Sequence, residues 1–347
     1  MIIDDSVLKY EEMAVFRLRT LYARYGYRQY TMNKFEQYDF YLRNKDFLVS
    51  DNIITFTDTN GKLMALKPDV TLSIVKNTRD LGPDDTAKLY YDENVYRVSK
   101  GNHAFSEITQ AGLECLGNIC EAEIAEVMML AARSLETISE NFVLDISHLG
   151  IITALIESLG LSNEDTRAII KAMGEKNPHE IANILNAAGA GDTVEADLLK
   201  MLVSVYGRPA DVLPKLRSML DNCGSGDRNV GAAGIAGPVT GESAGRVAYT
   251  ECSSGNGFGE CVSAAIDELE NYLRVFDGTG LEDRIRIDFS VVDDINYYNG
   301  IVFKGFIESV PDYVLSGGEY DKLMRKMKRS GRAIGFAVYL DQLERLS

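Results

Sequence analysis

The sequence predicts an α+β fold in which helices flank an antiparallel sheet. Three observations support this fold class. Short β-prone runs alternate with helical patterns in the first part of the chain, a long stretch after it is helical almost throughout, and β-prone runs return near the C-terminus. We therefore expect a core in two segments, residues 1–146 and 260–347, with a helical insertion domain at 147–222 and a flexible glycine-rich loop at 223–259.

The first core segment alternates between the two periodicities. Apolar residues at helical spacing predict an N-terminal helix with Gly26 as its C-cap, followed by a strand at 27–32. Asn60-Gly61 lies between two β-prone runs and predicts a tight hairpin over residues 53–66. Further elements are expected from the same patterns: a short helix at 68–75, strands at 87–98 and 107–117, and an amphipathic helix at 121–138.

The remaining segments differ in composition. The insertion carries two helix-start signals, a capping box over residues 162–165 and Asn177 before Pro178. The loop at 223–259 holds ten glycines, and its runs "GAAGIAG" and "GNGFGE" lack the lysine and the strand-to-helix context of a phosphate-binding loop, so a linker is expected. A helix at 262–276 leads back to the sheet, which resumes in residues 284–306 and 333–346.

Composition limits the class of protein. The chain has no apolar run long enough to cross a bilayer, and "MIIDDSVLKYEE" is acidic where a signal peptide is basic, so we expect a cytoplasmic protein with no membrane partner. A net charge of −16 repels phosphate backbones, so no nucleic-acid partner is expected. The five cysteines form no CxxC pair and favour inert thiols over a disulfide framework or a metal site.

The strand over residues 108–116 carries the most informative polar pattern. Gln110, Gly112 and Glu114 share one face because side chains alternate along a strand. An amide and a carboxylate then stand about 13 Å apart on either side of a glycine, which predicts a slot for a small polar molecule over that glycine. The alternative is a solvated sheet face without a binding role.

Other weak signals point to the same kind of site. Asp69 and Thr71 in "KPDVT" lie near a helix start, where a carboxylate can receive an amino group. Tyr297 and Tyr298 in "YYNG" and Tyr320 in "SGGEYD" can each supply an apolar wall and a hydroxyl group.

Together these segments occur in a known order. "YGYRQYTMNKFE", "LKPDVT", "NVYRVSKGNHAFSEITQAGLECLG", "DDINYYNGIVF", "SGGEYDKL" and "AIGFAVYLDQL" resemble the catalytic domain of class II histidyl-tRNA synthetases, including an antiparallel sheet and a helical insertion at 147–221. The resemblance covers nearly all of residues 5–347 except the glycine-rich loop. It implies that histidine is bound by the following residues: Asp69 and Thr71 at its amino group, Gln110 near its carboxylate, and Glu114, Tyr298 and Tyr320 at its imidazole.

The sequence departs from the synthetase pattern where that family contacts ATP. The resemblance implies arginines or a glutamate at five positions that hold other residues here: Ser99, Ala104, Ser106, Asp293 and Gln342. Arg97 is retained and can also bind the carboxylate of an amino acid. Because activation of an amino acid builds negative charge on the α-phosphate, this loss of cations predicts a histidine pocket without a functional ATP site. The sequence also stops where synthetases continue into an anticodon-binding domain, so tRNA recognition is not expected.

This combination resembles the regulatory subunits of ATP phosphoribosyltransferase. The resemblance implies a protein with no catalytic residues, cofactor or metal, which binds L-histidine for feedback control and partners a short catalytic subunit as a homodimer within a hetero-oligomer. Two alternatives stay open: a shortened histidyl-tRNA synthetase or synthetase-like ligase, and a free-standing histidine sensor.

Overall fold

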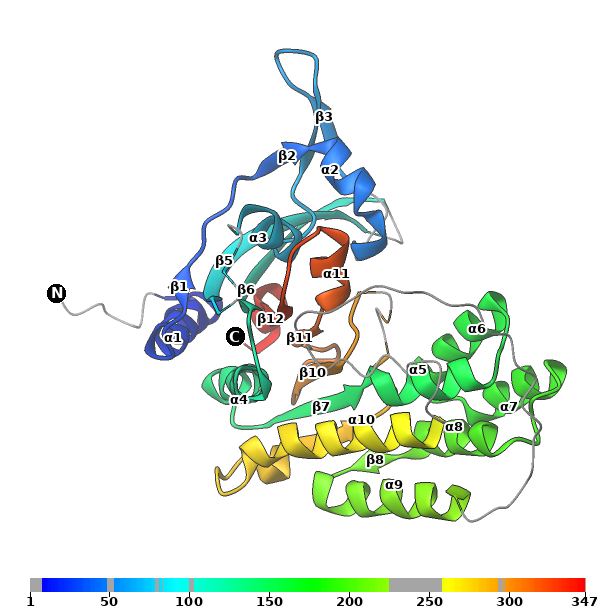
Figure 1. The fold of residues 1–347 in the computed structure, drawn as a ribbon. Coiled ribbons are helices and arrows are strands. Elements are labelled where there is room, and N and C mark those ends of the chain that lie inside the picture. Colours follow the sequence, from blue (N-terminus) through cyan, green and yellow to red (C-terminus); the bar gives the residue numbers. More distant parts are fainter. Residues whose placement is uncertain are drawn as a thin grey trace.

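A large sheet forms the centre of the computed structural model (Figure 1), which describes residues 8–48, 53–78, 81–82, 84–99, 103–224, 258–292, 295 and 297–346. Its strand order is β1-β5-β6-β12-β11-β10-β7-β9-β8, and every pair is antiparallel except β1–β5 and β7–β9. The strands are β1 (Arg28–Gln29), β5 (Thr86–Val98), β6 (Phe105–Gly117), β7 (Phe142–His148), β8 (Tyr206–Gly207), β9 (Ile285–Asp288), β10 (Ile301–Ile307), β11 (Leu315–Glu319) and β12 (Arg332–Tyr339). The predicted fold class is confirmed.

A smaller sheet projects from one side of the molecule, at the top of Figure 1. It consists of β2 (Phe35–Gln37), β4 (Leu63–Leu66) and β3 (Thr55–Thr57) in that order. The hairpin predicted from Asn60-Gly61 is the β3–β4 pair, and Gly61 has the positive φ of 77° that such a turn needs.

Helices cover the two faces of the large sheet unequally. One face packs on α1 (Tyr10–Arg24), α4 (Glu121–Ile138) and α10 (Phe258–Leu273), and Ala111, Leu113 and Cys115 of β6 are buried there. The other face carries α2 (Tyr38–Arg43), α3 (Thr71–Asn77) and α11 (Asp321–Lys326). The alternation predicted for β6 is therefore confirmed, but the polar face is buried too, and the interpretation as a solvated face is wrong.

The helical segment is less separate than the sequence suggests. It contains α5 (Leu149–Ser158), α6 (Asn163–Gly174), α7 (Pro178–Ala187), α8 (Val194–Ser204) and α9 (Pro209–Gly224), with Ser162 and Asn177 capping α6 and α7 as predicted. Strand β8 joins the large sheet through β9, and the helices share one hydrophobic cluster with the core. The division into domains stays a prediction.

Several boundaries differ from the sequence-based expectations. Helix α3 starts at Thr71 rather than Pro68, because the Oδ1 atom of Asp69 accepts a hydrogen bond from the backbone N–H of Leu72 at 2.8 Å. Helix α9 runs to Gly224 and α10 begins at Phe258, and the rest of the predicted loop lies outside the described residues. Short 3₁₀ helices complete the fold: η2 (Lys45–Phe47), η3 (Arg274–Phe276), η4 (Glu282–Arg284) and η5 (Leu340–Leu346).

One expectation about the cysteines is wrong. Cys261 is disulfide-bonded, whereas Cys115 and Cys120 are free thiols. An odd cysteine count without a CxxC pair does not exclude a disulfide bridge. In the part of the chain that the structure describes, no helix combines the length and the apolar character needed to cross a membrane.

Candidate functional site

A pocket is lined by residues of β5, β6, β12 and β11 and by residues at the start of α3. These four strands are neighbours in the large sheet (Figure 1). Its empty volume is about 510 Å³, including the open mouth. All seven residues predicted to bind histidine line it: Asp69, Thr71, Arg97, Gln110, Glu114, Tyr298 and Tyr320. The structure therefore gathers them in one place, although they lie as far as 251 positions apart in the sequence (320 minus 69).

Glu114 contributes a buried carboxyl group to this pocket. Its side chain comes from β6 and is only 2% exposed. Burial raises the pKa of Glu114 to about 8, and hydrogen bonds from Thr71 and Tyr320 oppose that rise. The Thr71 Oγ1 hydroxyl donates to Glu114 Oε1 at 2.5 Å, and the Tyr320 hydroxyl donates to Glu114 Oε2 at 2.6 Å. A carboxyl group that is largely protonated at neutral pH is thus held rigidly at the base of the pocket.

Glycines on the neighbouring strand leave space for this carboxyl group. Gly335 of β12 lies opposite Glu114 in the β6–β12 ladder. A Cβ atom at Gly335 would lie 1.7 Å from Glu114 Oε2, so any side chain there would displace the carboxyl group.

The predicted open slot over Gly112 is wrong in its detail. A Cβ atom at Gly112 would lie 2.6 Å from the hydroxyl oxygen of Tyr91, so this tyrosine covers the glycine. Tyr91 lies opposite Gly112 on β5 and is 2% exposed. The glycine therefore accommodates an aromatic residue of the pocket lining rather than the ligand itself.

Two oppositely charged groups lie near the start of α3. Asp69 Oδ1 is held by the N–H of Leu72, and Arg97 Nε donates to the carbonyl oxygen of Pro68 at 3.1 Å. Among the described residues that line the pocket, these two and Glu114 are the charged ones. When Glu114 is protonated, one carboxylate and one guanidinium remain, which suits a zwitterion of low net charge.

Aromatic rings form the walls. Tyr297 and Tyr298 contact each other edge to face with ring centroids 4.7 Å apart, and Tyr297 lies 5.9 Å from Tyr320. Sequence reasoning assigned no role to several lining residues: Tyr91, Ser316, Ala337 and Tyr339. The alternation of Gly335, Ala337 and Tyr339 along a β-prone run was the available signal for the last two.

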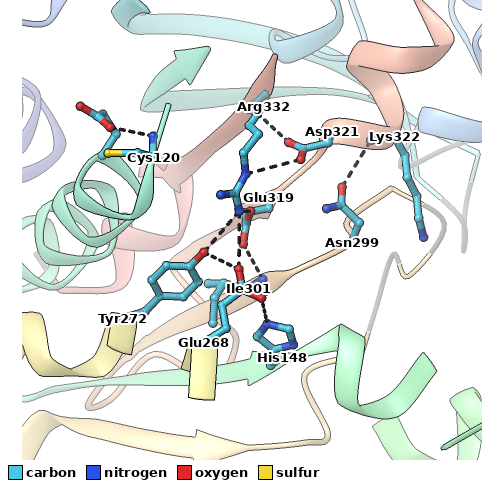
Figure 2. A network of polar contacts seen from close by, with 12 residues as sticks. Cys120, His148, Glu268, Tyr272, Asn299, Ile301, Glu319, Asp321, Lys322 and Arg332 are labelled. Carbon is cyan, nitrogen blue, oxygen red and sulfur yellow. Dashed lines mark hydrogen bonds and ion pairs between the residues drawn. The ribbon is translucent and has the colours of Figure 1, made fainter. Parts of the chain in front are cut away.

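A buried polar network surrounds Glu319, the residue before Tyr320 in the sequence (Figure 2). Glu319 is fully buried, and its Oε2 accepts from Arg332 Nη2 at 2.6 Å while its Oε1 accepts from the N–H of Ile301 at 3.0 Å. The backbone carbonyl of Glu319 also accepts from the N–H of Asn299 at 2.9 Å. One residue therefore joins the strand end that carries Tyr320 to the turn that follows Tyr298.

The same network reaches the helical part of the molecule. Arg332 Nη2 donates to the hydroxyl of Tyr272 at 3.3 Å, and that hydroxyl donates to Glu268 Oε1 at 2.6 Å. Glu268 Oε2 lies 3.2 Å from Nε2 of His148, the residue before α5 (Figure 2). Helix α10 and the start of α5 are thus connected to the residues that support the pocket wall.

Four of the positions predicted to have lost ATP contacts, Ser99, Ala104, Ser106 and Gln342, are not among the described residues that line the pocket. Ser99 and Ser106 share a hydrogen bond of 2.8 Å between their hydroxyl groups, and the carbonyl oxygen of Ala104 accepts the backbone N–H of Ser99 at 2.9 Å in the same hairpin. Gln342 lies in η5. Asp293 lies outside the described residues.

This fold and pocket agree with comparisons to known proteins. The chain belongs to the histidyl-tRNA synthetase family, whose model matches residues 4–228 and 257–343. A relative from Oceanobacillus iheyensis named ATP phosphoribosyltransferase regulatory subunit is 25% identical over 335 residues, covering 94% of this chain and 71% of the relative. Further relatives of 25–27% identity bear the same name.

Solved structures support the fold. An ATP phosphoribosyltransferase regulatory subunit/histidyl-tRNA synthetase from Bacillus halodurans C aligns with a TM-score of 0.74 at 21% identity, over 96% of this chain and 78% of that one. A chain of the ATP phosphoribosyl transferase (HisG:HisZ) complex from Thermotoga maritima aligns with a TM-score of 0.65 at 16% identity, over 95% and 97%. The class II synthetase-like architecture predicted from the sequence is confirmed.

Proposed function

We propose that this chain is a non-catalytic regulatory subunit of ATP phosphoribosyltransferase and that its pocket binds L-histidine. The observation that carries the ligand assignment is the buried Glu114 carboxyl group, held by Thr71 and Tyr320 between aromatic walls. Such a group can bond a ring nitrogen of imidazole, and aromatic walls contact a flat ring. The names of the relatives and the complex from Thermotoga maritima support the role as a subunit.

The remaining pocket residues suit the other two groups of histidine. Asp69 pairs with the ammonium group of histidine. The Thr71 hydroxyl donates its proton to Glu114, so its oxygen can still accept a hydrogen bond from the same ammonium group. Gln110 and Arg97 bind the carboxylate, the latter by a charge-assisted hydrogen bond. This orientation places the imidazole at Glu114 and the carboxylate toward Gln110.

The proposed role includes feedback control in the first step of histidine biosynthesis. A short catalytic subunit is the partner, and this chain forms a homodimer within the cytoplasmic hetero-oligomer. Histidine then inhibits by binding more tightly to the inactive state of the complex than to the active one, because a ligand shifts a conformational equilibrium only by its difference in affinity.

Calorimetry with L-histidine tests the ligand assignment. We expect Glu114→Ala to weaken binding at least tenfold, because a buried donor or acceptor left without its hydrogen-bond partner costs about 1–3 kcal/mol. Glu107→Ala is the matched control, since this exposed glutamate lies on the same strand but outside the pocket lining. Equal affinities for the wild type and Glu114→Ala would contradict the proposal.

Two further measurements separate the alternatives. Membership of the synthetase family favours a ligase as the second candidate. Histidine-dependent exchange of pyrophosphate into ATP would establish that activity, and we expect none because the family's ATP-contacting arginines are replaced at Ala104, Ser106, Asp293 and Gln342 and its glutamate at Ser99. If this chain were a free-standing sensor, mixing it with a short ATP phosphoribosyltransferase would leave the activity of that enzyme unchanged or absent. We expect instead a stable complex whose transferase activity histidine inhibits.

A further inference from the structure

The side chains that β12 contributes to the floor of the pocket increase in size along the strand. Gly335, Ala337 and Tyr339 occupy alternate positions on this strand, and all three line the pocket. In the ladder with β6 they lie opposite Glu114, Gly112 and Gln110, respectively. The floor thus has no side chain beside Glu114, one methyl group in the middle, and a large aromatic side chain beside Gln110.

Contacts with residues just before β11 hold Tyr339 in place. Its ring contacts that of Tyr313 edge to face, with centroids 5.6 Å apart and an interplanar angle of 77°. Its backbone N–H donates to the carbonyl oxygen of Val314 at 2.9 Å. Lys304 in turn contacts the ring of Tyr313, with its Nζ atom 4.6 Å from the ring centroid. A ligand that needed the space of the Tyr339 ring would have to break this packing.

We propose that Tyr339 is a specificity-determining residue that closes the carboxylate end of the pocket. It restricts the ligand to a free amino acid and excludes molecules extended at the carboxyl group, such as amides of a further amino acid. The inference rests on the proposed function, because it takes the imidazole to lie at Glu114 and the carboxylate to point toward Gln110 and Tyr339.

The distances agree with such a limit. Glu114 and Gln110 are four residues apart on one strand, so about 13 Å separates their Cα atoms. The side chains of Glu114 and Tyr339 enter this interval from its two ends. One additional residue on the ligand lengthens it by up to about 3.5 Å, toward the ring of Tyr339.

The test compares L-histidine with the dipeptide L-histidyl-glycine by calorimetry. The dipeptide keeps the imidazole and the free amino group and changes only the carboxyl end. We expect the wild type to bind histidine at least 100-fold more tightly than the dipeptide. Tyr339→Gly should bind the two ligands within tenfold of each other, and Tyr339→Phe, the control that keeps the ring, should discriminate as the wild type does.

Folding of the variants is followed by far-UV circular dichroism. Glycine weakens a strand, so Tyr339→Ala is measured in parallel and should also lose discrimination. Retained discrimination in folded Tyr339→Ala or Tyr339→Gly would overturn the inference while leaving histidine binding by the wild type, and hence the proposed function, intact. A wild type that binds the dipeptide as tightly as histidine would do the same, whereas a wild type that binds neither would overturn both.

Discussion

Glu114→Gln should change the pH dependence of stability in a predictable direction. Burial raises the pKa of Glu114 from its ordinary value of 4.5 to about 8 in the folded protein. Between these two values the folded state keeps a proton that the unfolded chain has already released. Stability rises with pH only where the unfolded state binds more protons, so this carboxyl group lowers the free energy of unfolding as pH rises from 4.5 toward 8.

The size of this effect follows from the two pKa values. Each unit of difference corresponds to about 1.36 kcal/mol, and between pH 5 and pH 8 the loss from Glu114 integrates to about 3.5 kcal/mol. The amide that replaces this carboxyl group in Glu114→Gln cannot ionise, so the variant lacks this loss. Any cost of the changed hydrogen bonds to Thr71 and Tyr320 shifts the variant by a constant amount and does not alter the slope.

Urea unfolding at several pH values measures the effect. The chain contains no tryptophan, so far-UV circular dichroism is the appropriate signal. Other titrating groups, such as Asp145 with its pKa raised by burial to about 7, contribute equally to both proteins and cancel in the difference. The free energy of unfolding of the wild type minus that of Glu114→Gln should fall by about 3.5 kcal/mol from pH 5 to pH 8. A difference that stays constant within about 1 kcal/mol would refute the reasoning, and the exposed-site control Glu107→Gln should follow the wild type.

Three further predictions concern the same region. Histidine affinity, measured by calorimetry, should be highest between about pH 6.5 and pH 8, because the complex shares a single proton between Glu114 and the imidazole. The affinity should fall above pH 8, where Glu114 of the free protein loses its proton, and below about pH 6.5, where free imidazole gains one. An affinity that only rises or only falls with pH would argue against this shared proton. Gly335→Ala should weaken histidine binding at least tenfold in a folded protein, since its Cβ would lie 1.7 Å from Glu114 Oε2, and unchanged binding would count against the predicted clash. Arg332→Met should lower the free energy of unfolding by about 3–5 kcal/mol in urea, and adding Glu319→Gln should recover part of it because the buried charge is removed; no recovery would show that another contact of Arg332 dominates.

Local patterns predicted the parts of the fold that depend on neighbouring residues. The Asn60-Gly61 hairpin, the caps at Ser162 and Asn177, and the alternation along β6 each follow from backbone chemistry within a few positions. The two-residue strand β8 has no such signal. It exists because β9 offers an unpaired edge, and that edge forms only once the chain has folded.

The candidate site shows the same division between local and long-range information. The seven predicted pocket residues were found through the order of several motifs, and the structure gathers them in one pocket. Pairings between strands were not visible in the sequence. Tyr91 covers Gly112 only because the β5–β6 register places them opposite each other, and Arg332 meets Glu319 only because β11 and β12 are adjacent.

The charge pattern of the pocket separates a ligand such as histidine from a nucleotide. With Glu114 protonated, the described lining residues include Asp69 and Arg97, one charge of each sign, and a zwitterion carries the same two charges. A triphosphate would bring several negative charges to lining residues of which, in the described part of the chain, one carries a guanidinium. At an effective dielectric constant of about 20, each unit charge about 4 Å from Asp69 would be repelled by about 4 kcal/mol. The charges of the described lining residues therefore suit an amino acid, whereas activation of that amino acid by ATP would require positive charge beyond the single guanidinium among them.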